Sequence, residues 1–135
     1  MNHLLERFLT LERELAVEKG NFVLFSLLER DDAQGKWDVV VSAPWLRPEQ
    51  KESMHFIVDR IRAKFKAEEL VSLSRVVLLS PTDAFVRNVN SAVQVEHGKA
   101  ELINNVFNGM QIKHAFLITS KRPSPNKESK AAATA

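Results

Sequence analysis

The sequence predicts a mixed α/β domain of the α+β type, with a single mixed five-stranded sheet and three helices in the order αββαβαββ. Three segments carry apolar residues at the three- and four-residue spacing of a helix. Five shorter apolar segments are bounded by turn residues such as Gly, Pro, Asn and Asp, which is typical of strands. The chain has 135 residues, of which 44% are hydrophobic, enough for one core. We therefore expect one globular domain over residues 1–122 and a flexible tail over residues 123–135.

The three expected helices begin or end at residues that suit those positions. The first spans roughly residues 3–18 and stops before Gly20. The second begins near Pro48, because proline suits the first helical position. The third begins with Ser80 as its cap and Asp83 three residues later. The apolar stripe of the first helix consists of Leu4, Leu5, Phe8, Leu11 and Leu15.

The order of the five expected strands indicates how they pair. The first two should form an antiparallel hairpin. The second, third and fourth strands are linked through helices, so we expect them to be parallel with right-handed crossovers. Asn108-Gly109 predicts a tight turn between the last two strands, and we expect the fifth strand at an edge of the sheet. The strands are predicted over residues 22–28, 37–43, 75–79, 100–107 and 110–119.

Composition excludes several classes of protein. Cysteine is absent, which removes disulfides, thiolate metal ligands and cysteine nucleophiles, and fits a reducing cytoplasm. No apolar run approaches the roughly 18–20 residues that span a bilayer. Residues 1–98 hold 13 Lys and Arg against 15 Asp and Glu, whereas residues 99–135 hold 6 against 2. We therefore expect a soluble cytoplasmic protein with a nearly neutral body, no membrane attachment, and a basic C-terminal end.

His114 stands where the last strand should carry an apolar residue. A two-residue turn pairs Phe107 with Met110. The same register places Ile103 opposite His114 and makes Glu101 a diagonal neighbour within reach. His114 is then either a general base oriented by a carboxylate, or a histidine that only bonds Glu101 or the backbone. We favour the second interpretation, because the sequence places no nucleophile or metal ligand beside it.

The densest polar cluster lies between the third helix and the fourth strand. It contains Glu96, His97 and Lys99, which together could activate a water or hold a metal. With Asp38 these residues define one alternative function, a metal-dependent hydrolase or nuclease. The spacing from Glu96 to Lys99 departs from the acid-x-Lys pattern of such nucleases. We therefore favour a solvated connection here, and we predict no metal site and no cofactor.

A second candidate site follows from the expected parallel strands. Ligands of open α/β sheets favour the edge where parallel strands end, and helix N-termini there suit an anion. We expect the Asn108-Gly109 turn to point to the same edge. The structural alternative is that these residues only close the core and cap a helix. The residues predicted at this ligand or interface edge are Trp45, Arg47, Ser80, Thr82 and Asp83.

Two basic pairs offer a third function, nonspecific binding of nucleic acid. Arg60 and Lys64 lie late in the second helix, and Lys121 and Arg122 precede the basic tail. The leading hypothesis remains a non-catalytic protein-interaction domain. Self-association as a homodimer would cover the exposed edge that a small open sheet leaves.

Overall fold

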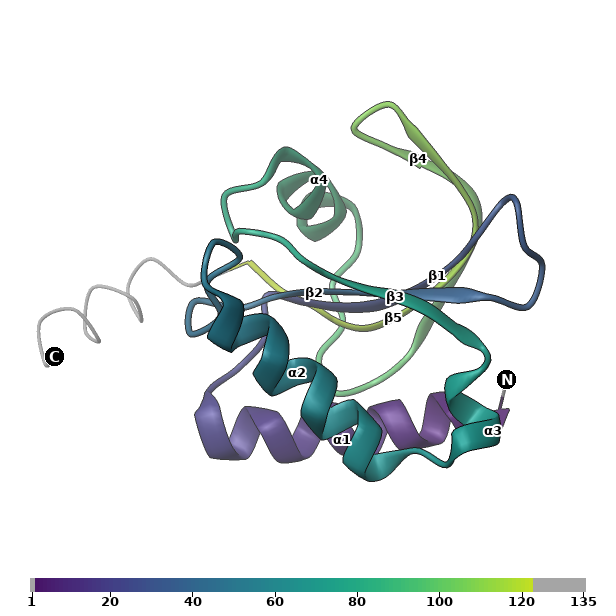
Figure 1. The fold of residues 1–135 in the computed structure, drawn as a ribbon. Coiled ribbons are helices and arrows are strands. Elements are labelled where there is room, and N and C mark those ends of the chain that lie inside the picture. The colour runs from purple at the N-terminus through teal and green to yellow at the C-terminus, as the bar shows by residue number, and fades with distance from the viewer. Residues whose placement is uncertain (1, 123–135) are drawn as a thin grey trace, which may run out of the picture.

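The computed structural model describes residues 2–122, which form four helices and five strands (Figure 1). The predicted single mixed sheet is confirmed, and α3 is a short helix that was not predicted. The predicted tail over residues 123–135 lies outside the described residues. The elements are α1 (Asn2–Lys19), β1 (Leu24–Glu29), β2 (Trp37–Ser42), α2 (Lys51–Lys64), α3 (Ala67–Leu70), β3 (Leu73–Leu78), α4 (Ala84–Ala92), β4 (Ala100–Phe107) and β5 (Met110–Ser120).

The sheet has the strand order β3-β2-β1-β5-β4. The predicted β1–β2 hairpin and the parallel β2–β3 pair are confirmed. The prediction that β4 is also parallel to them is wrong, because β5 runs antiparallel to β1 and β4 runs antiparallel to β5. The prediction that β5 lies at an edge of the sheet is also wrong. β5 pairs with β1 on one side and with β4 on the other, so β3 and β4 are the edge strands.

Two apolar cores lie on opposite faces of the sheet. Helices α1 and α2 cover one face, and α4 covers the other (Figure 1). The predicted stripe of α1 packs in the first core, where Phe8 contacts both Phe25 and Phe65. Phe85 of α4 packs edge-on against Phe107 in the second core. This three-layer arrangement buries the apolar β1 and β2 on both faces, as parallel and central strands require.

Two helix starts differ from the prediction. Helix α2 begins at Lys51 with Gln50 as its N-cap, so Pro48 precedes the helix. Helix α4 begins at Ala84, and its cap is Asp83, whose carboxylate accepts the Phe85 N–H at 2.8 Å. A carboxylate at the N-cap satisfies an otherwise unpaired helical N–H, which explains why Asp83 caps this helix.

The β4–β5 hairpin bends part of the way along its length. Its predicted register is confirmed, with Phe107 opposite Met110 and Ile103 opposite His114. Asn104 is skipped in the pairing and adopts a φ of 56°, a left-handed conformation that Asn tolerates better than most residues. Beyond it, Phe107 joins the core under α4, so the hairpin curls toward that helix (Figure 1).

No helix among residues 2–122 combines the length and the apolar character that crossing a membrane demands.

Candidate functional site

A carboxylate is fully buried on the inner face of α1. Glu12 follows Phe8 by four residues and precedes Leu15 by three, so it occupies a position of the apolar stripe. Its side chain is completely shielded from solvent. A buried charge without partners is strongly destabilising, so its two oxygens must be bonded.

A β-bulge supplies the first partner of this carboxylate. The register of the β1–β5 ladder shifts between Phe25 and Ser26, so that Phe25 pairs with Thr119 and Ser26 pairs with Leu117. The extra residue, Ile118, packs in the core under α1. Thr119 is thereby turned to the same face, and its hydroxyl donates to Glu12 Oε2 at 2.8 Å. Simple alternation would have placed Thr119 on the face of Leu117, under α4.

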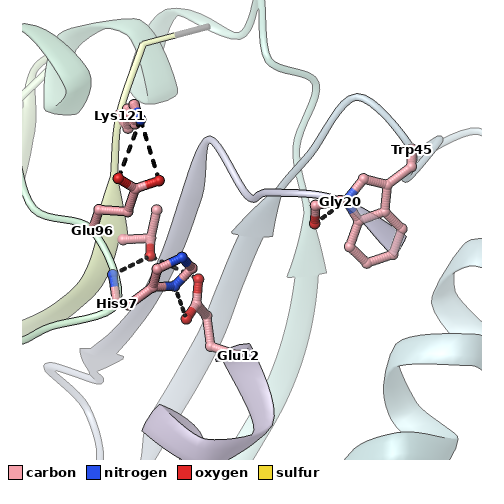
Figure 2. Close-up of polar contacts among 7 residues, drawn as sticks. Glu12, Gly20, Trp45, Glu96, His97 and Lys121 are labelled. Atoms are coloured by element: carbon pink, nitrogen blue, oxygen red, sulfur yellow. Dashed lines mark hydrogen bonds and ion pairs between the residues drawn. The ribbon is translucent and has the colours of Figure 1, made fainter. Parts of the chain in front are cut away.

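His97 supplies the second partner, from the loop between α4 and β4. Its Nδ1 lies 2.7 Å from Glu12 Oε1, and its backbone N–H donates to Thr119 Oγ1 at 3.1 Å (Figure 2). The residue has a left-handed φ of 51°, a conformation that persists only where surrounding contacts impose it. The Gly98 N–H, which donates to the carbonyl of Ile118 at 3.0 Å, is one such contact. Glu12, Thr119 and His97 therefore form a closed network, which we call the Glu12 centre.

The Glu12 centre borders a surface groove of about 690 Å³ between α1 and the loop that carries His97. Its lining combines apolar side chains of α1 with charged side chains. Among these, Glu6 lies 3.5 Å from Lys99 Nζ, and Glu14 lies 2.8 Å from Lys64 Nζ. The lining residues are Glu6, Leu9, Thr10, Arg13, Glu14, Val17, His97, Gly98 and Lys99.

The structure brings together only part of the predicted catalytic cluster. His97 and Lys99 line the same groove, whereas Glu96 bonds Lys121 at 3.1 Å (Figure 2). Asp38 does not join them: it lies in β2 opposite Leu28, and Arg75 Nε donates to its Oδ2 at 3.0 Å. Within residues 2–122, no group of three or more Asp, Glu, His or Cys side chains is arranged to hold a metal ion.

His114 makes the contact that its register predicts. Its Nε2 lies 2.7 Å from Glu101 Oε2, and its Nδ1 lies 3.4 Å from Glu29. The imidazole also packs edge-on against Trp37, with the ring centroids 5.3 Å apart. His114 is thus a half-buried residue held by two carboxylates and an indole ring.

Of the residues predicted at the carboxyl ends of β2 and β3, Trp45 has a structural role. Trp45 packs against Phe22, and its indole N–H donates to the Gly20 carbonyl at 2.8 Å (Figure 2). Gly20 has a φ of 128°, and a Cβ there would meet the Trp45 ring at 3.1 Å. The Asn108-Gly109 turn lies at the opposite end of the sheet, because β4 runs antiparallel to β2 and β3.

The remaining predicted residues of that edge lie at the surface. The exposed Arg47 donates its backbone N–H to Ser53 Oγ at 2.9 Å. The hydroxyls of Ser80 and Thr82 share a hydrogen bond of 2.9 Å. Thr82 also lines a cavity of about 350 Å³, together with Arg87 and Arg122.

The basic residues predicted to contact phosphate already have partners. Arg60 binds both carboxylate oxygens of Glu18, at 2.9 and 2.5 Å, and Lys64 bonds Glu14. These pairs join α2 to α1. Lys121 is held by Glu96, as above, and Arg122 donates to Ser91 Oγ at 2.6 Å.

The two edges of the sheet differ in character. On β3, Arg75 is charged and largely exposed, which discourages pairing with another strand. On β4, Glu101 is the single charged residue, and Ile103 and Val106 are exposed apolar residues. Within the described chain, residues 101–107 form no backbone hydrogen bond outside the β4–β5 ladder. Among residues 2–122, no segment therefore pairs with the outer edge of β4.

The chain matches no protein-family model, no curated protein and no solved structure.

Proposed function

We propose that this protein is a protein-interaction domain that forms a homodimer through the outer edge of β4. The single observation that supports the proposal most is the pair of exposed apolar side chains, Ile103 and Val106, on an edge strand with which no other strand among residues 2–122 pairs except β5. Natural proteins normally protect such an edge with charge, proline or a covering segment. The other edge of this sheet has such protection in Arg75.

The chemistry of β4 suits a second copy of the same chain. An antiparallel strand pair about a twofold axis is self-complementary, so one patch serves both copies. The register that sets Ile103 opposite Val106 of the second copy also sets Glu101 opposite Asn108. No like charges then face each other, and the five-stranded sheet continues across the dimer.

Sedimentation equilibrium over a range of concentrations tests this proposal. We expect the wild-type protein to approach twice the 15.3 kDa chain mass. Substitution of Ile103→Lys or Val106→Lys should return the monomer mass, because each places a charge on the pairing edge. The matched control is Val71→Lys: Val71 is 64% exposed, as against 63% for Ile103 and for Val106, but it lies beside β3.

A wild-type mass of 15.3 kDa at every concentration would refute the homodimer. Equal dissociation by Val71→Lys would also refute it, since the effect would then not be specific to β4. In the dimer, hydrogen exchange should be slower in residues 101–107 of the wild type than in the Ile103→Lys variant.

A further inference from the structure

A cavity of about 350 Å³ lies beside α4, next to the end of β5. Its wall combines two arginines with two hydroxyl groups and one amide, and none of the described residues that line it is acidic. The volume is near the lower end of the roughly 300–1,000 Å³ usual for small-molecule sites, so the cavity suits a small ligand. The lining residues are Pro81, Thr82, Arg87, Asn90, Ser91 and Arg122.

The two arginines of this cavity are held close to each other. Arg87 and Ser91 are four residues apart in α4, so their side chains share one face of the helix. Arg122 follows β5, and its guanidinium donates to Ser91 Oγ at 2.6 Å. A second guanidinium is thereby fixed beside the helix face that carries Arg87. Because like charges repel each other, this placement favours an anion between the two arginines.

No carboxylate of the described residues neutralises these two arginines. Neither Arg87 nor Arg122 forms an ion pair within that part of the chain. The acidic residues nearest to Arg87 along the chain are already bonded, since Asp83 caps α4 and Glu96 is in an ion pair of 3.1 Å. Guanidinium groups present several N–H donors in one plane, an arrangement that matches the oxygens of an oxyanion.

Asn90 adds a hydrogen-bond acceptor to the wall of the cavity. The residue is almost completely buried, and its Nδ2 donates to the Val23 carbonyl at 3.0 Å and to Ser120 Oγ at 3.1 Å. A carbonyl can only accept, so the contact with Val23 fixes the orientation of the amide. Oδ1 accepts no hydrogen bond from residues 2–122, which leaves it as the polar atom of this side chain available to the cavity. An acceptor between two cations selects an anion that itself carries an O–H donor.

We propose that this cavity binds a phosphate group that retains a P–O–H proton, as inorganic phosphate does at neutral pH. Arg87 and Arg122 donate to its charged oxygens, and the P–O–H group donates to Asn90 Oδ1. The Ser91 hydroxyl accepts from Arg122, so its own proton is available to a further phosphate oxygen. Sulfate has the same tetrahedral shape but carries no O–H group at neutral pH, so the site should discriminate between the two anions.

Titration of the full-length protein with phosphate and with sulfate, at neutral pH and constant ionic strength, tests the site. Nitrogen–proton correlation NMR follows the backbone amides of α4 and the side-chain amide of Asn90. We expect saturable binding of phosphate and an affinity for sulfate at least about tenfold weaker, because sulfate leaves Asn90 Oδ1 without a donor. Equal affinities for the two anions, or no saturable response to phosphate, would overturn the proposal. The comparison requires no substitution of Asn90, whose loss would leave core groups unpaired.

Variants at the surface locate the bound anion without disturbing the core. Arg87 and Arg122 are both exposed. Arg87→Gln and Arg122→Gln should each weaken phosphate binding by about tenfold, the usual effect of losing one charge-assisted hydrogen bond. The control Arg13→Gln removes an exposed arginine that lines a different groove, and it should leave the affinity unchanged. Equal losses in all three variants would indicate general attraction of anions, and this result or unchanged affinity in either cavity variant would overturn the proposal.

Discussion

Two histidine–carboxylate pairs in this molecule share a geometry but differ in their surroundings. The ring nitrogen and the carboxylate oxygen are 2.7 Å apart in both His97–Glu12 and His114–Glu101. The imidazoles are equally exposed, 27% for His97 and 29% for His114. The carboxylates differ: Glu12 is completely buried, whereas Glu101 is 51% exposed. The two pairs therefore differ in the burial of the carboxylate but not in the distance between nitrogen and oxygen.

Burial determines how much each pair depends on its neighbours. Water solvates Glu101 if His114 is lost, so the pair contributes little to stability. Glu12 has no access to water, and its charge relies entirely on His97 and Thr119. At the same nitrogen–oxygen distance, His114–Glu101 is therefore a surface contact, whereas His97–Glu12 belongs to a network that supports a buried carboxylate.

The largest expected effect on stability comes from removing one side chain of each pair. His97→Ala removes the partner of Oε1 from the buried Glu12, which keeps only its bond to Thr119, and should lower the free energy of unfolding by about 3–5 kcal/mol. Glu101→Ala leaves a half-buried His114 and should lower it by less than about 1 kcal/mol. Urea unfolding, extrapolated to water, measures both. Losses of equal size would show that burial of the carboxylate is not what distinguishes the pairs.

The second effect sharpens the comparison by removing the buried charge. In a His97→Ala protein, the further change Glu12→Leu should recover most of the lost stability, because an apolar side chain suits the core around α1. The same unfolding measurement compares the double variant with His97→Ala alone. If Glu12→Leu destabilised the His97→Ala protein further, the uncompensated charge would not be the cause of the loss.

The third effect isolates the hydroxyl that Glu12 shares with the His97 backbone. Thr119→Val keeps the shape but leaves a buried carboxylate oxygen and a backbone N–H without partners. We expect a loss of about 1.5–3 kcal/mol in unfolding free energy. The control Thr119→Ser keeps the hydroxyl and loses one methyl group, so its loss of unfolding free energy should be about 0.8 kcal/mol. Similar losses for both variants would assign the effect to packing.

The smallest effect concerns a surface carboxylate that has no histidine partner. The Lys66 backbone N–H, and then Arg7, hold the pKa of Glu69 below its ordinary value of 4.5. A lowered pKa stabilises the fold above the unfolded pKa, and this stability is lost as the pH falls through the folded pKa. Glu69→Gln should therefore be slightly less stable than wild type at neutral pH.

That difference should disappear in acid, once Glu69 is protonated in both the folded and the unfolded states. Thermal unfolding of wild type and Glu69→Gln, from neutral pH to well below 4.5, measures the trend. A difference that stays constant with pH would mean that the charge of Glu69 is not responsible.

The His114 pair could be predicted from sequence, because its geometry is local. Asn108-Gly109 defines a two-residue turn, and a two-residue turn sets the register of every pair along the hairpin. Glu101 and His114 are 13 residues apart and belong to that one hairpin. The apolar periodicities of α1 and α2 were likewise local patterns, and both helices form close to where they were expected.

The Glu12 centre could not be predicted in the same way. Glu12 and His97 are 85 residues apart, and Thr119 lies 107 residues from Glu12. One indication was present in the sequence: Glu12 occupies a position of the apolar stripe, between Phe8 and Leu15. That position predicts a buried carboxylate, but it does not identify the partner.

Local pattern was sufficient for the three long helices, the strands and the β4–β5 register, because hydrogen bonds and side-chain period within a short segment decide them. The direction of β4 and the bulge at Ile118 depended on the complete fold. They arise because β5 pairs with both β1 and β4. A single inserted residue in that ladder reverses the face of Thr119 and joins β5 to Glu12. Sequence periodicity cannot specify such a reversal, because it follows from how well two distant strands and a helix fit together.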